Sequence, residues 1–161
     1  MSILNNLPKA TASANEYIYK NGEKGKYGVL KNLPSETNTS IKYNEKNIVI
    51  STINSTGLAR FCEVAFNDGR PIDFTKVSKV IMVFDVNQPN VYAEFYLAIA
   101  DKIVPTTFVK TSVSVVQQGS KTNLSMLFDV SDVTGLKYLL IKNQGYSSTS
   151  TVTIKEVYLM K

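Results

Sequence analysis

Apolar and polar residues alternate over short stretches of this 161-residue chain, and turn-forming residues separate the stretches at spacings near ten residues. Leu124, Met126 and Phe128 recur at every second position, which is typical of a strand packed on at least one face. Residues 80–86 and 136–141 carry apolar groups on both faces, which predicts two strands in sheet interiors. No stretch has the period of an amphipathic helix, so the pattern predicts about ten strands.

Two short polar segments predict hairpins. The dipeptide Asn21-Gly22 is the strongest hairpin signal in the chain; it follows a short strand over residues 17–19 and predicts a return strand over residues 27–30. The polar turn at residues 44–46 separates two further apolar stretches in the same way. The early part of the chain therefore has the layout of a meander.

The last predicted strand changes phase halfway along. Val152 and Ile154 fall on one face, whereas Val157 and Leu159 would fall on the other face of a regular strand. One extra residue brings all four side chains to the same face. We therefore predict a β-bulge near Lys155-Glu156.

One nine-residue pattern occurs twice. Residues 72–80 and 128–136 both run apolar, Asp, apolar, Ser or Thr, any residue, Val, Ser or Thr, any residue, apolar. We expect the aspartate of each copy, Asp73 and Asp129, to accept backbone N–H bonds at a single turn, and the valine of each copy to fill the core. The pattern predicts the same corner used twice, each time at the start of a central strand.

These elements define the expected fold and its boundaries. Residues 17–161 predict one all-β domain, an antiparallel β-sandwich of jelly-roll type with about ten strands. Residues 1–16 predict an N-terminal arm, because Ile3, Leu4 and Leu7 lack a period that would let the segment fold alone. We expect these three residues to dock on a neighbouring subunit, since apolar side chains stabilise only when buried.

Composition excludes several classes of function. The chain has no histidine and one cysteine, which excludes an internal disulfide and removes the commonest general base and metal ligand, so we expect no metal and no cofactor. The net charge is +5, but the lysines are scattered and only two arginines are present, so we expect no nucleic-acid partner. No apolar run is long enough to cross a membrane, and the start of the chain does not resemble a signal peptide.

Paired carboxylates are the remaining route to catalysis. Asp129 with Asp132 and Asp73 with Asp85 are nominal pairs for glycoside hydrolysis. Each of these aspartates falls at the end of a strand, where capping explains it, so we expect no enzyme activity. A calcium ion at such a corner is the alternative, but no dense run of acidic ligands supports it.

Tyrosines are the candidates for ligand contact. The chain has nine tyrosines, seven phenylalanines and no tryptophan, and a tyrosine on a jelly-roll face can stack on a sugar ring while its hydroxyl makes a polar contact. Tyr92, Tyr96 and Tyr146 are the proposed glycan contacts, with Tyr17 and Tyr27 as further candidates. The alternative for each is ordinary packing with the hydroxyl in solvent.

Four motifs together resemble a known family of modules: residues 17–23 (YIYKNGE), 72–75 (IDFT), 128–135 (FDVSDVTG) and 152–159 (VTIKEVYL). They are similar to the galactose-binding-like, carbohydrate-binding-module-like jelly rolls in tail-fibre and minor structural proteins of phages that infect low-GC Gram-positive bacteria. The likeness covers most of residues 17–160. Those modules often have a Gly-Trp pair after the first hairpin, where this chain has Lys26-Tyr27-Gly28-Val29.

The resemblance implies a non-catalytic structural or accessory protein of a phage virion, such as a capsid decoration or a head or tail fibre component. Its partners would be neighbouring virion subunits, in a homo-oligomer or on a capsid or tail protein. Its location would be the virion, assembled in the host cytoplasm. The alternative is an adhesion module that recognises a carbohydrate on the host cell surface.

Overall fold

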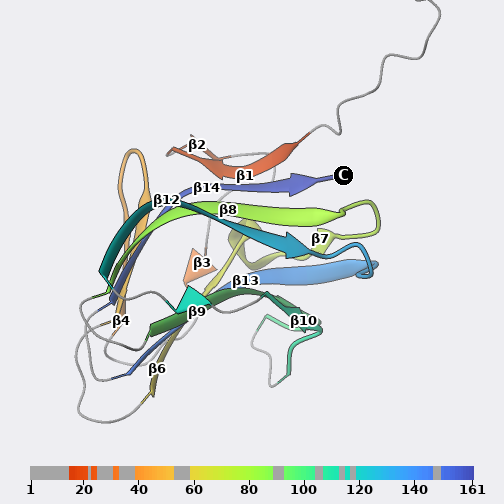
Figure 1. The fold of residues 1–161 in the computed structure, drawn as a ribbon. Helices are drawn as coiled ribbons and strands as arrows, with labels where there is room; N and C mark the ends of the chain where they lie inside the picture. The colour runs from red at the N-terminus through yellow and green to blue at the C-terminus, as the bar shows by residue number, and fades with distance from the viewer. Residues whose placement is uncertain are drawn as a thin grey trace, which may run out of the picture.

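The computed structural model describes residues 15–21, 23–24, 31–32, 39–52, 59–88, 93–103, 107–112, 115–116, 119–146 and 150–161. These residues form two antiparallel sheets packed face to face (Figure 1). The antiparallel jelly-roll β-sandwich expected from the sequence is thereby confirmed. The predicted arm lies outside the described residues up to Ala14, and β1 begins at Glu16.

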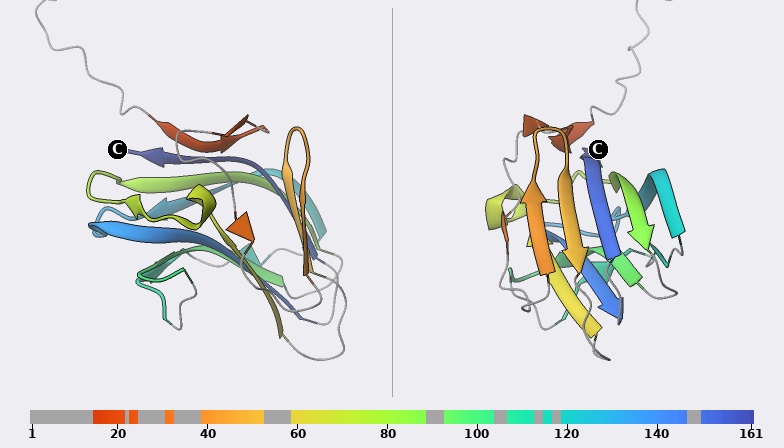
Figure 2. Two further views of the ribbon diagram at one scale, coloured as in Figure 1. Left: turned by 180° about the vertical axis from the view of Figure 1, so that it is seen from behind. Right: turned by 90° about the vertical axis from the view of Figure 1, so that its left-hand side faces the viewer.

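Sheet A has the strand order β12-β8-β14-β1-β2, with β5 also paired to β14 and β4 to β5. Its strands are β1 (Glu16–Lys20), β2 (Glu23–Lys24), β4 (Thr39–Tyr43), β5 (Ile48–Thr52), β8 (Lys79–Gln88), β12 (Gly119–Asp129) and β14 (Ser150–Met160). The right-hand view of Figure 2 shows β4, β5, β14, β8 and β12 side by side.

Sheet B has the order β10-β9-β13-β6-β3, with β11 also paired to β9 and β7 to β13. Its strands are β3 (Lys31–Asn32), β6 (Ala59–Ala65), β7 (Ile72–Asp73), β9 (Ala93–Ala100), β10 (Lys110–Thr111), β11 (Val115–Val116) and β13 (Leu136–Tyr146). The one helical element in the described part of the chain is the short 3₁₀ turn Asn67–Gly69. Five of the fourteen described strands have only two residues, which alternation of apolar residues cannot reveal.

The core follows the alternation seen in the sequence. The main cluster of buried side chains lies between the sheets and includes Val80, Met82, Phe84 and Val86 from β8 and matching positions of β12, β13 and β14. Strand β8 lies between β12 and β14, and β13 lies between β9 and β6, so the two strands predicted for sheet interiors are confirmed there. Leu136 differs, because it lies at the end of β13 and is 64% exposed.

The first hairpin also differs in part from the expectation. The turn at Asn21 is present, with the positive φ of 45° that favours asparagine and glycine. Its return strand, β2, follows at once and pairs Lys20 with Glu23. The predicted return over residues 27–30 lies outside the described residues. A two-residue turn brings the return strand directly back, which explains the earlier position.

Sheet A contains a β-bulge in each neighbour of β8. The register of β14 against β8 shifts between Ile154 and Glu156, which confirms the predicted bulge, and Val152, Ile154, Val157 and Leu159 are all buried as expected. The register of β12 against β8 shifts between Lys121 and Leu124. Both shifts lie next to Asp85 or its neighbour in β8, so the bulges of β12 and β14 fall at nearly the same level.

Asp85 binds both bulges at once. Its Oδ1 accepts the backbone N–H of Asn123 at 2.8 Å and lies 2.9 Å from Lys155 Nζ. Lys155 Nζ also donates to Asn123 Oδ1 at 2.8 Å. Asn123 has a φ of 54°, a backbone conformation that asparagine tolerates better than most residues. One carboxylate on β8 therefore holds the irregular residues of both neighbouring strands.

The bulges coincide with a bend in the molecule. Figure 1 shows β8, β12 and β14 bending together, and sheet B bending in the same direction beneath them. Bulges bend a strand and increase its local twist. The outer face of sheet B lies on the inside of this bend (Figure 1).

The bulge in β14 also divides the edge of that strand that faces away from β8. On that edge β1 pairs with Glu156–Leu159 and β5 pairs with Ser150–Ile154.

We predict that Asp85→Ala lowers the free energy of unfolding by about 1.5–3 kcal/mol, the usual contribution of a hydrogen bond to a charged group. Denaturant unfolding of the purified variant measures the loss. Asp101→Ala is the matched control, because it removes a single exposed ion pair with Lys137 and should cost less than about 1 kcal/mol. Equal stability of Asp85→Ala and the unchanged protein would show that Asp85 does not hold the bulges.

Candidate functional site

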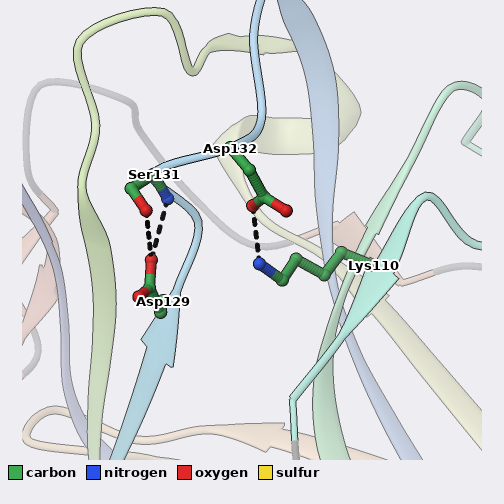
Figure 3. Close-up of polar contacts among 4 residues, drawn as sticks. All are labelled: Lys110, Asp129, Ser131 and Asp132. Atoms are coloured by element: carbon green, nitrogen blue, oxygen red, sulfur yellow. Dashed lines mark hydrogen bonds and ion pairs between the residues drawn. The ribbon is translucent and has the colours of Figure 1, made fainter.

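The first candidate is the corner that carries Asp129 and Asp132 (Figure 3). Asp129 Oδ1 accepts two hydrogen bonds from Ser131, one from the backbone N–H at 3.0 Å and one from Oγ at 2.7 Å. Asp132 points away from this contact, and its Oδ1 lies 2.6 Å from Lys110 Nζ. Val130 and Val133 are buried, and Gly135 ends the corner with a φ of 76°.

The second corner repeats this geometry. Asp73 Oδ1 accepts the backbone N–H of Thr75 at 3.0 Å and Thr75 Oγ1 at 2.7 Å, and Val77 is buried as Val133 is. The two corners also bind each other, since Phe74 N–H donates to the carbonyl of Gly135 and Gly135 N–H donates to Thr75 Oγ1. The repeat predicted from the sequence is confirmed, and each copy leads into a central strand.

Hydrogen bonds to these carboxylates lower their pKa values. The Ser131 hydroxyl and backbone N–H lower the pKa of Asp129, and the Thr75 hydroxyl and backbone N–H lower the pKa of Asp73. The ammonium of Lys110 lowers the pKa of Asp132. Partial burial raises the pKa of Asp85, but the bonds from Lys155 and Asn123 outweigh it, so the net shift is downward.

These pKa values favour structural roles for the aspartates. A catalytic acid needs a pKa raised toward the working pH, which is opposite to the shift found at all four. Asp73 and Asp85 also belong to different sheets, so the second nominal pair is not brought together as a pair of catalytic carboxylates.

Among the described residues, no three histidine, cysteine, aspartate or glutamate side chains lie in a metal-ligating group. The described part of the chain also has no helix of the length and hydrophobicity that crossing a membrane requires.

Two of the three proposed glycan contacts lie on neighbouring strands of sheet B. The register pairs Tyr96 of β9 with Lys142 of β13, and Tyr146 is the last residue of β13. The register of β13 is continuous against both β9 and β6 from Leu140 onward. Tyr92 lies outside the described residues, as do Ile3, Leu4 and Leu7.

Part of the outer face of sheet B is covered by the chain itself. Ala98, Ala100 and Leu140 are fully buried in a second small cluster, apart from the main core. Phe108 and Ile103, from the segment between β9 and β10, pack against this cluster. This cluster includes the Leu140–Ala98 register pair, and the next register pair along the same strands with the same parity is Lys142–Tyr96.

The outer face of sheet A carries an apolar row that the sequence analysis did not single out. The register connects Leu127 of β12 to Ile81 of β8, Ile81 to Tyr158 of β14, and Tyr158 to Tyr17 of β1. We call these four residues the sheet A row. The sequence contains a signal for this row, because Leu127 and Ile81 are apolar residues at positions where alternation along their own strands predicts a solvent-facing residue. Only the register shows that the two residues are neighbours.

No protein-family model matches the sequence, and no curated protein matches it. Solved structures of family 29 carbohydrate-binding modules are similar. One from Piromyces equi is 10% identical, with 92% of this chain and 91% of that chain covered and a TM-score of 0.54. A mutant of a family 29 module is 13% identical, with 91% and 90% covered and a TM-score of 0.57.

A third structure is a mutant of a family 29 module complexed with mannohexaose. It is 14% identical, with 91% of this chain and 90% of that chain covered and a TM-score of 0.54. Likeness at such identities establishes the fold. The chain therefore has the jelly-roll β-sandwich of carbohydrate-binding modules over almost its whole length.

We predict that the two corners contribute to acid sensitivity. Because the folded-state pKa values of Asp73 and Asp129 lie below the ordinary value of about 3.9, their contribution to stability is complete above that pH and is lost as the pH falls through the lowered values. The double variant Asp73→Asn/Asp129→Asn should therefore have a lower melting temperature than the unchanged protein at pH 7, with the difference shrinking below about pH 4.

Thermal unfolding between pH 7 and pH 2 measures this effect. Glu45→Gln, an exposed change in the turn between β4 and β5, is the control and should leave the curve unchanged. A constant difference between the double variant and the unchanged protein over the whole range would contradict the assigned role.

Proposed function

We propose that this chain is a non-catalytic glycan-binding module and that the outer face of sheet B beyond the Leu140–Ala98 pair holds the glycan. The fold supports this function, since the similar solved structures are carbohydrate-binding modules and one of them is a complex with mannohexaose. A module with this fold needs no reacting group, because it only has to present a shaped surface.

The observation that carries the proposal is the register of β9, β13 and β6. Because side chains alternate between the two faces of a strand, positions 142, 144 and 146 of β13 belong to the same face as Leu140. Tyr96, paired with Lys142, belongs to it as well. Two of the tyrosines proposed from the sequence thus share one face, at levels about 13 Å apart along the strands.

Polar positions accompany the two tyrosines. Across the three strands the register forms one row of Glu63, Lys142 and Tyr96, and a second row of Phe61, Gln144 and Glu94. Sugar rings have an apolar C–H face that stacks on aromatic rings and a rim of hydroxyl groups that need hydrogen-bond partners. Aromatic residues mixed with carboxylate, ammonium and amide groups are the composition that such a ligand requires.

The position of this face suits an extended ligand. It lies on the inside of the bend that both sheets share (Figure 1), and the Phe108 and Ile103 cover bounds it at one end. A chain of sugars can lie along such a curved surface and contact both tyrosines. The four aspartates considered as catalytic pairs all have lowered pKa values, so we expect binding without cleavage.

Our second, narrower proposal is that the module belongs to a phage virion. It is favoured by the sequence motifs that resemble phage modules, the repeated corner above all, and it would place the glycan on the host cell surface. Neighbouring subunits, oligomeric state and location in a virion stay predictions. Co-sedimentation of the protein with intact purified particles tests them, and its absence from the particles would remove this proposal while leaving glycan binding open.

We predict that Tyr96→Ala and Tyr146→Ala each weaken glycan binding by about fivefold or more, because truncating a central aromatic contact typically costs more than ~1 kcal/mol. Isothermal titration calorimetry of the purified chain measures the affinity, with mannohexaose as the first probe and a panel of soluble oligosaccharides after it. Chain-length analysis of the sugar after incubation should show no cleavage.

Tyr158→Ala is the matched control, because it removes an aromatic side chain from the outer face of the other sheet. It should bind the sugar with unchanged affinity. Failure of the unchanged protein to bind any member of the panel would overturn the proposed function. Loss of binding in Tyr158→Ala, with normal binding by the other two variants, would place the ligand on the wrong sheet for our proposal.

A further inference from the structure

The sheet A row is a line of two aliphatic and two aromatic residues on the outer face of the sandwich. It crosses β12, β8, β14 and β1 in a single line of register pairs. Leu127 is 59% exposed at one end, and Ile81 beside it is 8% exposed. At the other end the rings of Tyr17 and Tyr158 lie 5.4 Å apart, and Lys20 Nζ lies 4.6 Å from the centre of the Tyr17 ring.

Residues that are mostly polar bound the row on both sides. The next outward positions toward the corners are the register pair Asp129 and Lys79. On the other side, beyond Ser125, Val83 and Glu156, lies the Asp85 network with Lys155. A narrow apolar stripe between polar rows has the shape of a docking surface for one extended segment.

The N-terminal segment begins at this stripe. The described chain starts at Asn15, two residues before Tyr17, and Tyr17 is the last member of the row. An ion pair between Glu16 and Lys161 holds the start of β1 against the end of the chain. The preceding segment contains Ile3, Leu4 and Leu7 within mostly small and polar residues. These three are the large aliphatic residues of the segment, and residues 8–14 connect them to Asn15 as a short tether.

The tether is long enough to reach across the row. Four neighbouring strands span about 14 Å between the first and the last. The segment between Leu7 and Asn15 extends up to ~25 Å. The three apolar residues can therefore reach Ile81 and Leu127 from the point where the described chain begins.

We propose that residues 1–14 fold back across the sheet A row of their own chain and cover Leu127, beside the partly exposed rings of Tyr158 and Tyr17, with Ile3, Leu4 and Leu7. From the sequence we expected a neighbouring subunit as the receptor. A short tether, however, gives the chain's own face an effective concentration in the millimolar range, which favours the internal contact in dilute solution. This role is separate from glycan binding, which uses the opposite sheet.

Disulfide trapping tests the occupant directly. Leu4→Cys is combined with Leu127→Cys in a Cys62→Ala background and oxidised at micromolar protein concentration. We expect a disulfide within the monomer, seen on a non-reducing gel and by peptide mapping. Leu4→Cys combined with Val109→Cys is the matched control, because Val109 is also apolar and 46% exposed but belongs to the sheet B side. That pair should stay reduced.

A thermodynamic cycle gives a second readout that needs no cysteine. Leu127→Ser should lower the melting temperature of the full chain and leave that of a chain lacking residues 1–14 unchanged, because the contact is then already lost. The same shift in both backgrounds, together with no disulfide, would overturn the docking. A disulfide-linked dimer in place of the monomer would overturn the internal contact and make a second copy the receptor.

Discussion

One carboxylate, Asp85, binds the irregular residues of two neighbouring strands from the strand between them, at the level where sheet A bends. Extra residues bend a strand and leave the ladder locally unpaired, so they need other hydrogen-bond partners. The Asp85 contacts with Asn123 and Lys155 hold a residue of each bulge. The bend then places β1 and β5 on the same edge of β14 and gives sheet B an outer face on the inside of the curve (Figure 2).

The two faces outside the core have different chemistry, and we assign them different partners. Beyond the Leu140–Ala98 pair, the outer face of sheet B has tyrosine positions with ammonium, amide and carboxylate positions in register beside them. Such a surface suits a ligand with apolar ring faces and many hydroxyl groups. The sheet A row is mainly apolar and narrow, which suits an aliphatic protein segment. Separate partners on opposite faces would let the module hold its glycan without disturbing the arm.

Local pattern predicted much of this structure. The strand interiors, the bulge at Lys155 and the repeated corner all follow from residues that are close in sequence, because alternation and Asx-type hydrogen bonds act over a few positions. Tyr96 and Tyr146 were proposed from residue type alone, and the register then brought them to one face. The exposure of Leu136 was missed, because an apolar residue at a strand end looks the same as one in the middle.

The rest could not be predicted because it depends on contacts between distant segments. Asp85 was expected to cap a strand end, and its actual role requires the bulge of β12 as well as that of β14. The sheet A row takes one residue from each of four strands, and no window of sequence contains them. Mapping of the ligand by NMR tests the central claim most directly: ¹⁵N-labelled protein is titrated with a sugar that it binds. We predict that the amide shifts cluster in β9, β13 and β6. Shifts confined to β12 and β8 would contradict the account.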